Sequence, residues 1–168
     1  AYSYGFVDRN AQKIENLNLF VQSYPKSIYK DDALFELGNT YVAENDDQEA
    51  ITTYQNILTN YKQSIYYPKA MSKLALIYFN KGENQEALVR LKQLIKEYPN
   101  SQEALQAVQT ARLIYIDLGQ TDEYATWVRG LDFVEVADSD IEEATYEAAE
   151  NKFLDNETNK AIEGFKKY

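Results

Sequence analysis

The sequence predicts an all-α fold, built as a solenoid of antiparallel helix pairs. Three observations predict it: a register of 37 residues along the chain, two stretches of helical periodicity within each unit, and a polar or glycine-containing turn between them. One helix pair cannot bury its apolar face alone. Stacked neighbouring pairs bury a continuous core, which is why such units occur in arrays.

The register is clearest in a short repeated string. Gln-Glu-Ala occurs at 48–50 and again at 85–87, which is 85 − 48 = 37 positions later, whereas a third copy at 102–104 is out of register. Four lines of residues recur at the same spacing, and the last three of these lines follow one another at steps of three residues, as one face of a helix requires. The lines are Tyr4, Tyr41, Tyr78 and Tyr115; Ile14, Ile51, Leu88, Ala125 and Ile162; Leu17, Tyr54, Leu91, Val128 and Phe165; and Phe20, Ile57, Leu94, Leu131 and Tyr168.

Each complete unit is expected to hold two antiparallel helices. The predicted pairs are 31–44 with 48–60, 68–80 with 84–97, and 105–118 with 121–131. Gly82 and Gly119 stand where a helix must end, because glycine takes the left-handed conformation without a Cβ penalty. Pro68 stands at a helix start, where its missing N–H costs nothing. Tyr41 and Tyr78 are predicted to be buried between the helices of their units.

A short acidic segment at 138–142 alternates oxygen-bearing side chains. It lacks the glycine and the distal glutamate of a calcium loop, so no metal site is expected there. Ser139 and Glu142 are instead predicted to form a capping box that opens a helix.

Composition restricts the possible functions. The chain of 168 residues is 45% apolar, which can supply a core. It contains no apolar run near the roughly 20 residues that a membrane-spanning helix needs. It has no Cys and no His, so the usual nucleophile and the usual general base are missing, and no glycine-rich phosphate loop is present. We therefore expect a protein that is not an enzyme and that binds no cofactor.

The net charge of −10 is unevenly distributed, because residues 132–157 hold 10 Asp and Glu against one Lys. A chain with this balance and no basic stripe cannot neutralise phosphates, so nucleic-acid binding is not expected. The acids would instead steer a basic partner toward this part of the chain.

The residues resemble the tetratricopeptide repeat family. The matching positions are Leu34, Leu37, Gly38, Tyr41, Ala50 and Tyr54 in one unit, and Met71, Leu74, Ala75, Tyr78 and Ala87 in the next. The resemblance implies a right-handed superhelical solenoid that binds other proteins. Three later residues depart from the pattern: Arg112 replaces a small residue, Tyr124 replaces an alanine, and Lys152 replaces the tyrosine.

The register divides the chain into a partial unit at 1–30, units at 31–67, 68–104 and 105–141, and a partial unit at 142–168. Ala1 and Tyr4 would then end an earlier helix, and the chain is expected to be a fragment of a longer array. The connectors Tyr-Pro-Lys-Ser at 24–27 and Tyr-Pro-Asn-Ser at 98–101 are similar to those of bacterial cell-envelope members of the family, such as an outer-membrane assembly lipoprotein and a partner of the Tol–Pal system. This similarity favours the periplasm or the outer membrane over the cytoplasm.

In the family, the first helix of each unit lines a concave groove, and its variable positions meet the ligand. Carried over by register, the partner-binding residues are Phe35, Asn39 and Val42; Ser72, Leu76, Phe79 and Asn80; Gln109, Leu113, Ile116 and Asp117; and Tyr146, Glu150 and Phe153. Four of them form an apolar stripe at 37-residue spacing: Val42, Phe79, Ile116 and Phe153. The apolar stripe either accepts the apolar face of a peptide or helix, or contacts the next helix pair.

Trp127 is a separate candidate, because other units hold Thr53, Arg90 and Gly164 at its position. It either anchors an interface or covers the irregular segment 132–137.

The sequence thus favours a protein-binding scaffold. Two alternatives stay open: a glycan-binding helical module, which would need its tyrosines on the groove side, and a structural spacer or self-assembling array, which would show no apolar exposure in the groove.

Overall fold

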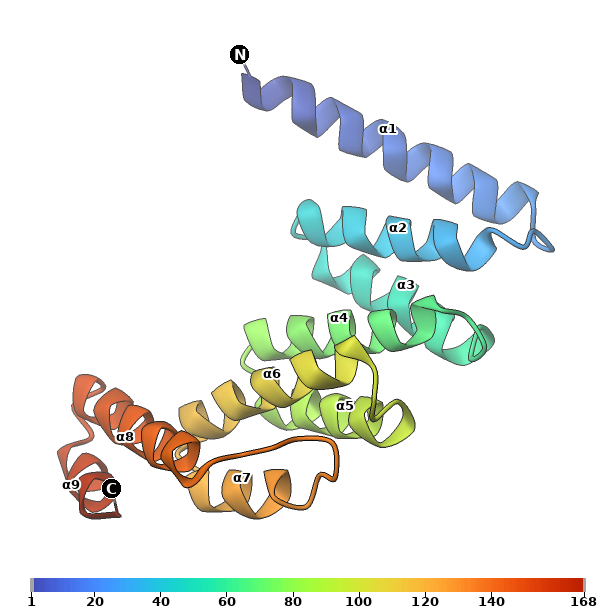
Figure 1. The fold of residues 1–168 in the computed structure, drawn as a ribbon. Helices are drawn as coiled ribbons and strands as arrows, with labels where there is room; N and C mark the ends of the chain where they lie inside the picture. Colours follow the sequence, from blue (N-terminus) through green and yellow to red (C-terminus); the bar gives the residue numbers. More distant parts are fainter. Residues whose placement is uncertain (1, 168) are drawn as a thin grey trace. The chain divides into compact units, whose positions relative to one another are not determined.

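The computed structural model describes the backbone of residues 2–167 and the side chains of residues 9–167. This part of the chain is helical and contains no strand, which confirms the all-α fold class. The helices are α1 Tyr2–Ser23, α2 Lys30–Ala43, α3 Asp47–Asn60, α4 Tyr66–Asn80, α5 Asn84–Glu97, α6 Gln102–Leu118, α7 Thr121–Val128, α8 Asp138–Leu154 and α9 Thr158–Lys167 (Figure 1). Ala1, Tyr168 and the side chain of Tyr4, which the register also uses, lie outside the described residues.

The chain forms two compact units, Ala1–Glu83 and Asn84–Tyr168. In the first unit, α1 packs on α2, α2 on α3, and α4 on both α2 and α3. In the second, α5 packs on α6, α6 on α7 and α8, α7 on α8, and α8 on α9. The predicted partners α2 with α3 and α6 with α7 are therefore in contact.

The turns between helices repeat with the register. Asn45, Gly82, Gly119 and Asn156 all have positive φ angles, between 60 and 74°, and successive members lie 37 residues apart. In each turn, the residue with positive φ donates its N–H to the carbonyl oxygen three residues before it. The residue after it donates its N–H to the carbonyl oxygen five residues before that donor. The N···O distances are 2.8 to 3.1 Å. This double hydrogen bond is a Schellman motif, which Gly and Asn accommodate best. Four identical helix stops thus underlie the 37-residue period.

The first helix departs from the register. Asp8 stands at the position of the left-handed residues, 37 before Asn45, yet α1 continues through it from Tyr2 to Ser23. Neither glycine nor asparagine is present there to adopt the left-handed turn. The expected helix end after Tyr4 is therefore not formed.

The predicted capping box at Ser139 and Glu142 is also wrong. Helix α8 begins at Asp138, so Ser139 already lies in its first turn. The carboxylate of Asp140 accepts a hydrogen bond from the N–H of Ala137, the residue before the helix, at 2.9 Å. Because Asp140 satisfies this N–H, the helix starts earlier than the sequence pattern indicated.

The core of the first unit centres on Tyr54 rather than on Tyr41 or Tyr78. Tyr54 is fully buried, its hydroxyl donates to Asn39 Oδ1 at 2.9 Å, and burial, reinforced by the charge of Glu36, raises its pKa. Tyr41 and Tyr78 are only half-buried at the edge of this core, which corrects the prediction. The hydroxyl of Tyr41 accepts a hydrogen bond from Asn18 of α1 at 3.1 Å, which places this ring at the contact between α1 and α2 and not between α2 and α3.

Candidate interaction surfaces

The apolar stripe does not have one environment along the chain. Ile116 is 4% exposed and clusters with Ala144 and Ala148 of α8. At this position the stripe contacts the next helix pair, so Ile116 cannot line an open groove. Phe79 is half-buried, whereas Val42 and Phe153 are exposed.

Other residues assigned to the groove also differ in exposure. Phe35 is half-buried and stacks on Tyr66 with ring centroids 5.0 Å apart, while Asn39 is engaged by the Tyr54 hydroxyl. These two side chains serve the core of the first unit. The residues that remain open to solvent are Leu76, Asn80, Gln109, Leu113, Asp117, Tyr146 and Glu150, while Ser72 is half-buried.

Helices α6 and α8 are joined by an arginine that pairs with two acids and is followed in the sequence by an exposed leucine. Arg112 lies between the two helices, with a guanidinium nitrogen 3.1 Å from a Glu147 oxygen and another 3.6 Å from Glu143. Its side chain is largely buried, so the residue that replaces the family's small residue joins α6 to α8. The next residue, Leu113, is 50% exposed.

The direction of Leu113 follows from the helix geometry. Tyr115 points toward α7, where its ring lies 5.9 Å from that of Trp127. Two residues along an α-helix correspond to about 200° of rotation, so Leu113 points to the opposite side of α6. We call Leu113 and Asp117 of α6, with Glu143 and Glu147 of α8, the acidic surface.

Trp127 belongs to an aromatic cluster on the α7 side. Its ring centroid lies 5.9 Å from Tyr115 and 6.2 Å from Tyr124, and Lys92 Nζ lies 5.4 Å from the Tyr115 ring and 5.5 Å from the Trp127 ring. Burial raises the pKa of Tyr124, and Arg112 partly offsets this. Tyr124, which replaces an alanine of the family pattern, thus fills space next to Tyr115. Trp127 remains half-buried and also borders a hollow at Gly130 and Phe133.

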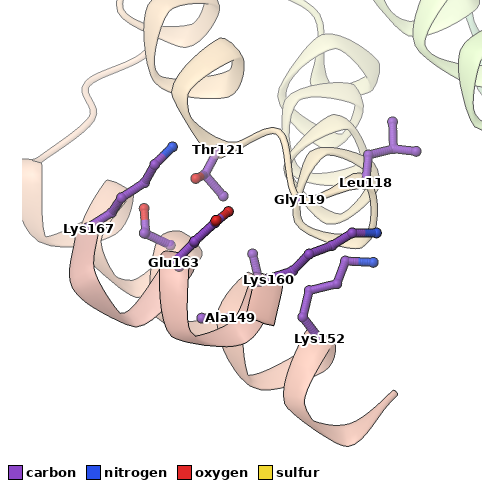
Figure 2. A pocket seen from close by; sticks show the side chains of 11 residues that line it. Leu118, Gly119, Thr121, Ala149, Lys152, Lys160, Glu163 and Lys167 are labelled. Atoms are coloured by element: carbon purple, nitrogen blue, oxygen red, sulfur yellow. The ribbon is translucent and has the colours of Figure 1, made fainter. Parts of the chain in front are cut away.

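Lys152 borders a pocket of about 300 Å³ between the α6–α7 turn and helices α8 and α9. Figure 2 shows Lys152, Lys160, Lys167 and Glu163 around it. Both Lys152 and Lys160 pair with Glu157, and Lys167 lies 2.6 Å from Asp122. The lysines are therefore neutralised by neighbouring acids, and the pocket has no surplus of positive charge that would favour an anion. It lies where a lysine replaces the tyrosine of the other units.

Two kinds of feature are missing from the part of the chain that the structure describes. None of its helices is both long enough and apolar enough to span a bilayer. Among the side chains of residues 9–167, no three acidic groups are placed so as to hold a metal ion.

Two segments match the family model described as tetratricopeptide repeat, residues 32–64 and 69–101. Their starts lie 69 − 32 = 37 residues apart, as the register requires. No curated protein matches the chain.

Solved structures share the fold. A tetratricopeptide repeat protein from Parabacteroides merdae superimposes with a TM-score of 0.66 at 20% identity, covering 98% of this chain and 62% of that one. The chain thus spans less than two thirds of that protein's length. The nearly identical TPR-like repeats of a protein named as a kinesin light chain of Podosopora anserina give a TM-score of 0.58 at 17% identity, covering 98% of this chain and 88% of that one. A single-substitution variant of those repeats gives 0.59 at 17% identity, with coverage of 99% and 88%.

Together these matches support the tetratricopeptide repeat interpretation and show a solenoid-type helical fold.

Proposed function

We propose that this chain is a non-enzymatic scaffold whose acidic surface binds a basic amphipathic helix or peptide of another protein. Tetratricopeptide repeats generally serve as scaffolds for protein–protein interaction, which supports the class of partner. The observation that carries the finer proposal is the half-exposed Leu113, which follows Arg112 on α6, the residue that pairs with Glu143 and Glu147 of α8.

The chemistry of this surface determines the partner it fits. An exposed leucine gives an apolar side chain a place to pack, and the surrounding acids favour a ligand that carries Lys or Arg beside its apolar face. Arg112 holds Glu143 and Glu147 in position, so part of their charge is compensated. Asp117 and Glu150 add exposed acids on the same two helices. Charge complementarity of this kind chiefly raises the association rate and makes binding sensitive to salt.

The two alternative functions have weaker support. A glycan-binding module would need its tyrosines on the groove side, but Tyr115 is buried, and Tyr146 is the one tyrosine among the residues assigned to the groove by register. A spacer would need no exposed apolar residue beside the acids, and Leu113 is such a residue. The division at 31–67, 68–104 and 105–141, and the bacterial envelope as location, remain predictions from the register and from the connectors.

The proposal can be tested with synthetic peptides. The probe is an amphipathic peptide with leucines on one face and lysines beside them, and its control has glutamates in place of the lysines. Fluorescence anisotropy should detect binding of the lysine peptide alone, weakening as salt is raised.

A variant of the chain locates the site. Leu113→Ser should reduce affinity by at least about tenfold, as loss of an anchor residue does. Leu19→Ser, a matched change at an exposed leucine of α1, should leave the affinity unchanged. Equal binding of both peptides, or full binding by Leu113→Ser, would contradict the proposal.

A further inference from the structure

Two hollows lie between α5 and α7, on the side of α6 that carries Tyr115. In the described part of the chain, α5 and α7 each pack near α6, but their backbones do not pack on each other. The first hollow has a volume of about 710 Å³ and the second about 530 Å³, and both are bordered by Lys92 and Trp127. We call the groove that they form, with Lys92, Lys96, Tyr115, Trp127, Leu131 and Phe133 on its walls, the outer groove.

The second hollow lies where α7 ends early. Helices α3 and α5 each have 14 residues, whereas α7 has 8 and ends at Val128. Gly130 and Leu131 each donate an N–H to the carbonyl oxygen three residues before, at 3.1 Å, which tightens the last turn before the chain leaves the helix. Leu131 corresponds by register to Ile57 and Leu94, which are 0% exposed, yet Leu131 is only half-buried. The early end of α7 thus leaves apolar side chains open.

The two aromatic residues of this hollow are peculiar to its unit. Trp127 and Phe133 are both half-buried and border the hollow from the α7 side. At their register positions the other units have smaller or charged residues: Thr53, Arg90 and Gly164 for Trp127, and Thr59 and Lys96 for Phe133. A tryptophan at the edge of a hollow is typical of residues that anchor a protein interface.

The charge of the second hollow is opposite to that of the chain as a whole. The chain carries a net charge of −10, yet Lys92 and Lys96 border this hollow against the single carboxylate of Asp132. The two lysines lie one helical turn apart and are exposed. Neither forms an ion pair with an acid in the described part of the chain. The ammonium group of Lys92 instead lies 5.4 Å from the Tyr115 ring and 5.5 Å from the Trp127 ring.

The acids of the outer groove are at its other end. Asp122 and Glu123 border the first hollow from the first turn of α7, and Asp122 is paired with Lys167. A ligand in the second hollow therefore meets two unpaired lysines and two aromatic rings. Carboxylates beside an apolar side chain complement this arrangement, whereas a basic ligand would place its cations against Lys92 and Lys96.

The depth of the hollow favours a peptide over a small molecule. Its wall on the α5 side includes Lys96, Pro99 and Asn100, all of which are exposed. Sites for small molecules usually enclose most of the ligand surface, which so open a wall does not do. A peptide segment needs cover on one side only.

We propose that the outer groove binds an acidic peptide segment of another protein. An apolar side chain of the segment packs against Trp127 and Phe133, and its carboxylates lie beside Lys92 and Lys96. The outer groove is on the side of α6 opposite to Leu113 and takes a ligand of the opposite charge. It is therefore independent of the acidic surface, and either site can be lost without the other.

Trp127 is the only tryptophan in the sequence, so its fluorescence reports on the outer groove directly. The probe is a tryptophan-free peptide with a phenylalanine flanked by glutamates, and its control has lysines in place of the glutamates. At physiological ionic strength, where charges farther away than about 8 Å are largely screened, the glutamate peptide should shift the emission of Trp127 to shorter wavelength. The lysine peptide should leave the emission unchanged.

Charge variants locate the site. Lys96→Glu should weaken binding of the glutamate peptide by about tenfold or more, because it reverses a charge beside the ligand. Lys73→Glu, the same change at an exposed lysine of α4, should leave the affinity unchanged, and so should Leu113→Ser. Trp127→Ala should abolish binding of a labelled glutamate peptide in fluorescence anisotropy, with its helical content checked by circular dichroism.

An emission that stays constant up to about 1 mM glutamate peptide would overturn the proposal, since binding that weak is not specific. Undiminished binding by Lys96→Glu, or the same emission shift with the lysine peptide, would overturn it as well. If benzoate alone shifted the emission at the same concentration as the peptide, the hollow would be a site for small anions and the proposal would also fail.

Discussion

The pair α2–α3 and the pair α8–α9 occupy the same register, three units apart, and differ mainly in what lies next to them. In the first pair, α4 packs on α3, and the core positions Ile51 and Tyr54 are closed. In the second, Ile162 and Phe165 are open. The comparison shows that burial at a repeat position depends on the neighbouring helix and not on the residue alone, as expected when each pair contacts only its neighbours.

The two pairs also differ in which helix carries the glycine that allows the two helices to pack closely. A Cβ on Gly38 of α2 would lie 2.6 Å from the Tyr54 ring, so α3 approaches the glycine on the first helix. In the later pair the first helix has Ala149, and a Cβ on Gly164 of α9 would lie 2.7 Å from its Cβ. The close approach is kept although the small residue has moved to the partner helix.

The largest expected effect is the loss of stability when the aromatic ring at the central position of each pair is removed. Tyr54→Ala should lower the free energy of unfolding by about 3 to 5 kcal/mol, because it removes a fully buried ring and leaves a cavity. Phe165→Ala should cost less than about 1.5 kcal/mol, since its ring keeps contact with solvent. Chemical denaturation of the two variants at low protein concentration measures both. Similar losses would mean that α9 is as closed as α3.

A second pair of variants compares two residues on α6. Ile116→Ser should cost about 2 to 4 kcal/mol, because it loses its packing against Ala144 and Ala148 and buries a hydroxyl. Leu113→Ser, three residues away and half exposed, should change stability by no more than about 0.5 kcal/mol. Thermal melts distinguish them. Equal stability of both variants would place Ile116 on an open surface after all.

Alkaline titration sharpens the difference between the two pairs, because the later one has phenylalanine where α3 has Tyr54. The pKa of Tyr54 is raised above its ordinary value of 10.0, chiefly by burial. A raised pKa means that the neutral hydroxyl is favoured in the folded state. The contribution of Tyr54 to the free energy of unfolding is therefore intact below pH 10 and is lost as the pH rises through the pKa of the folded state. The absorbance of tyrosinate should therefore be the same in the folded original chain and the folded Tyr54→Phe variant at moderately alkaline pH. At the highest pH, where Tyr54 ionises in the original chain, the variant should show one ionised tyrosine fewer.

The smallest expected effect is the change of stability at acidic pH that comes from Glu157, next to helix α9. Hydrogen bonds from Lys160 and Lys152 lower the pKa of Glu157 below 4.5. A lowered pKa favours the carboxylate in the folded state, so this stabilisation is present above pH 4.5 and is lost as the pH falls through the lower value. Glu157→Gln should reduce the loss of stability between about pH 5 and pH 3 slightly. An unchanged acid dependence would show that the ion pairs do not form in solution.

Much of the fold could be predicted from the sequence, because the 37-residue register records both the apolar faces and the helix stops. Gly82 and Gly119 were recognisable as helix stops, and the polar turn around Asn45 also predicted a helix end, whereas the stop at Asn156 was not recognised, since asparagine marks the left-handed conformation less distinctively than glycine. The start of α8 could not be placed, because Asp140 caps the chain from inside the helix.

The candidate site was less predictable, for a reason that the two pairs illustrate. Periodicity reports which residues share a side of a helix, but it does not report whether another helix covers that side. Ile116 and Phe153 have the same register, yet α8 covers the first and the second is 59% exposed. The pairing of Arg112 with Glu143 and Glu147 could not be predicted either, because it depends on the position of α8 relative to α6.

Amide hydrogen exchange of the chain at submicromolar concentration tests most directly whether neighbouring helices set the burial of each pair. Peptides from α3, residues 47–60, should exchange slowly, near the limit set by global unfolding, and peptides from α9, residues 158–167, should exchange through local opening at much lower free energy. Equal protection of α3 and α9 would contradict the account.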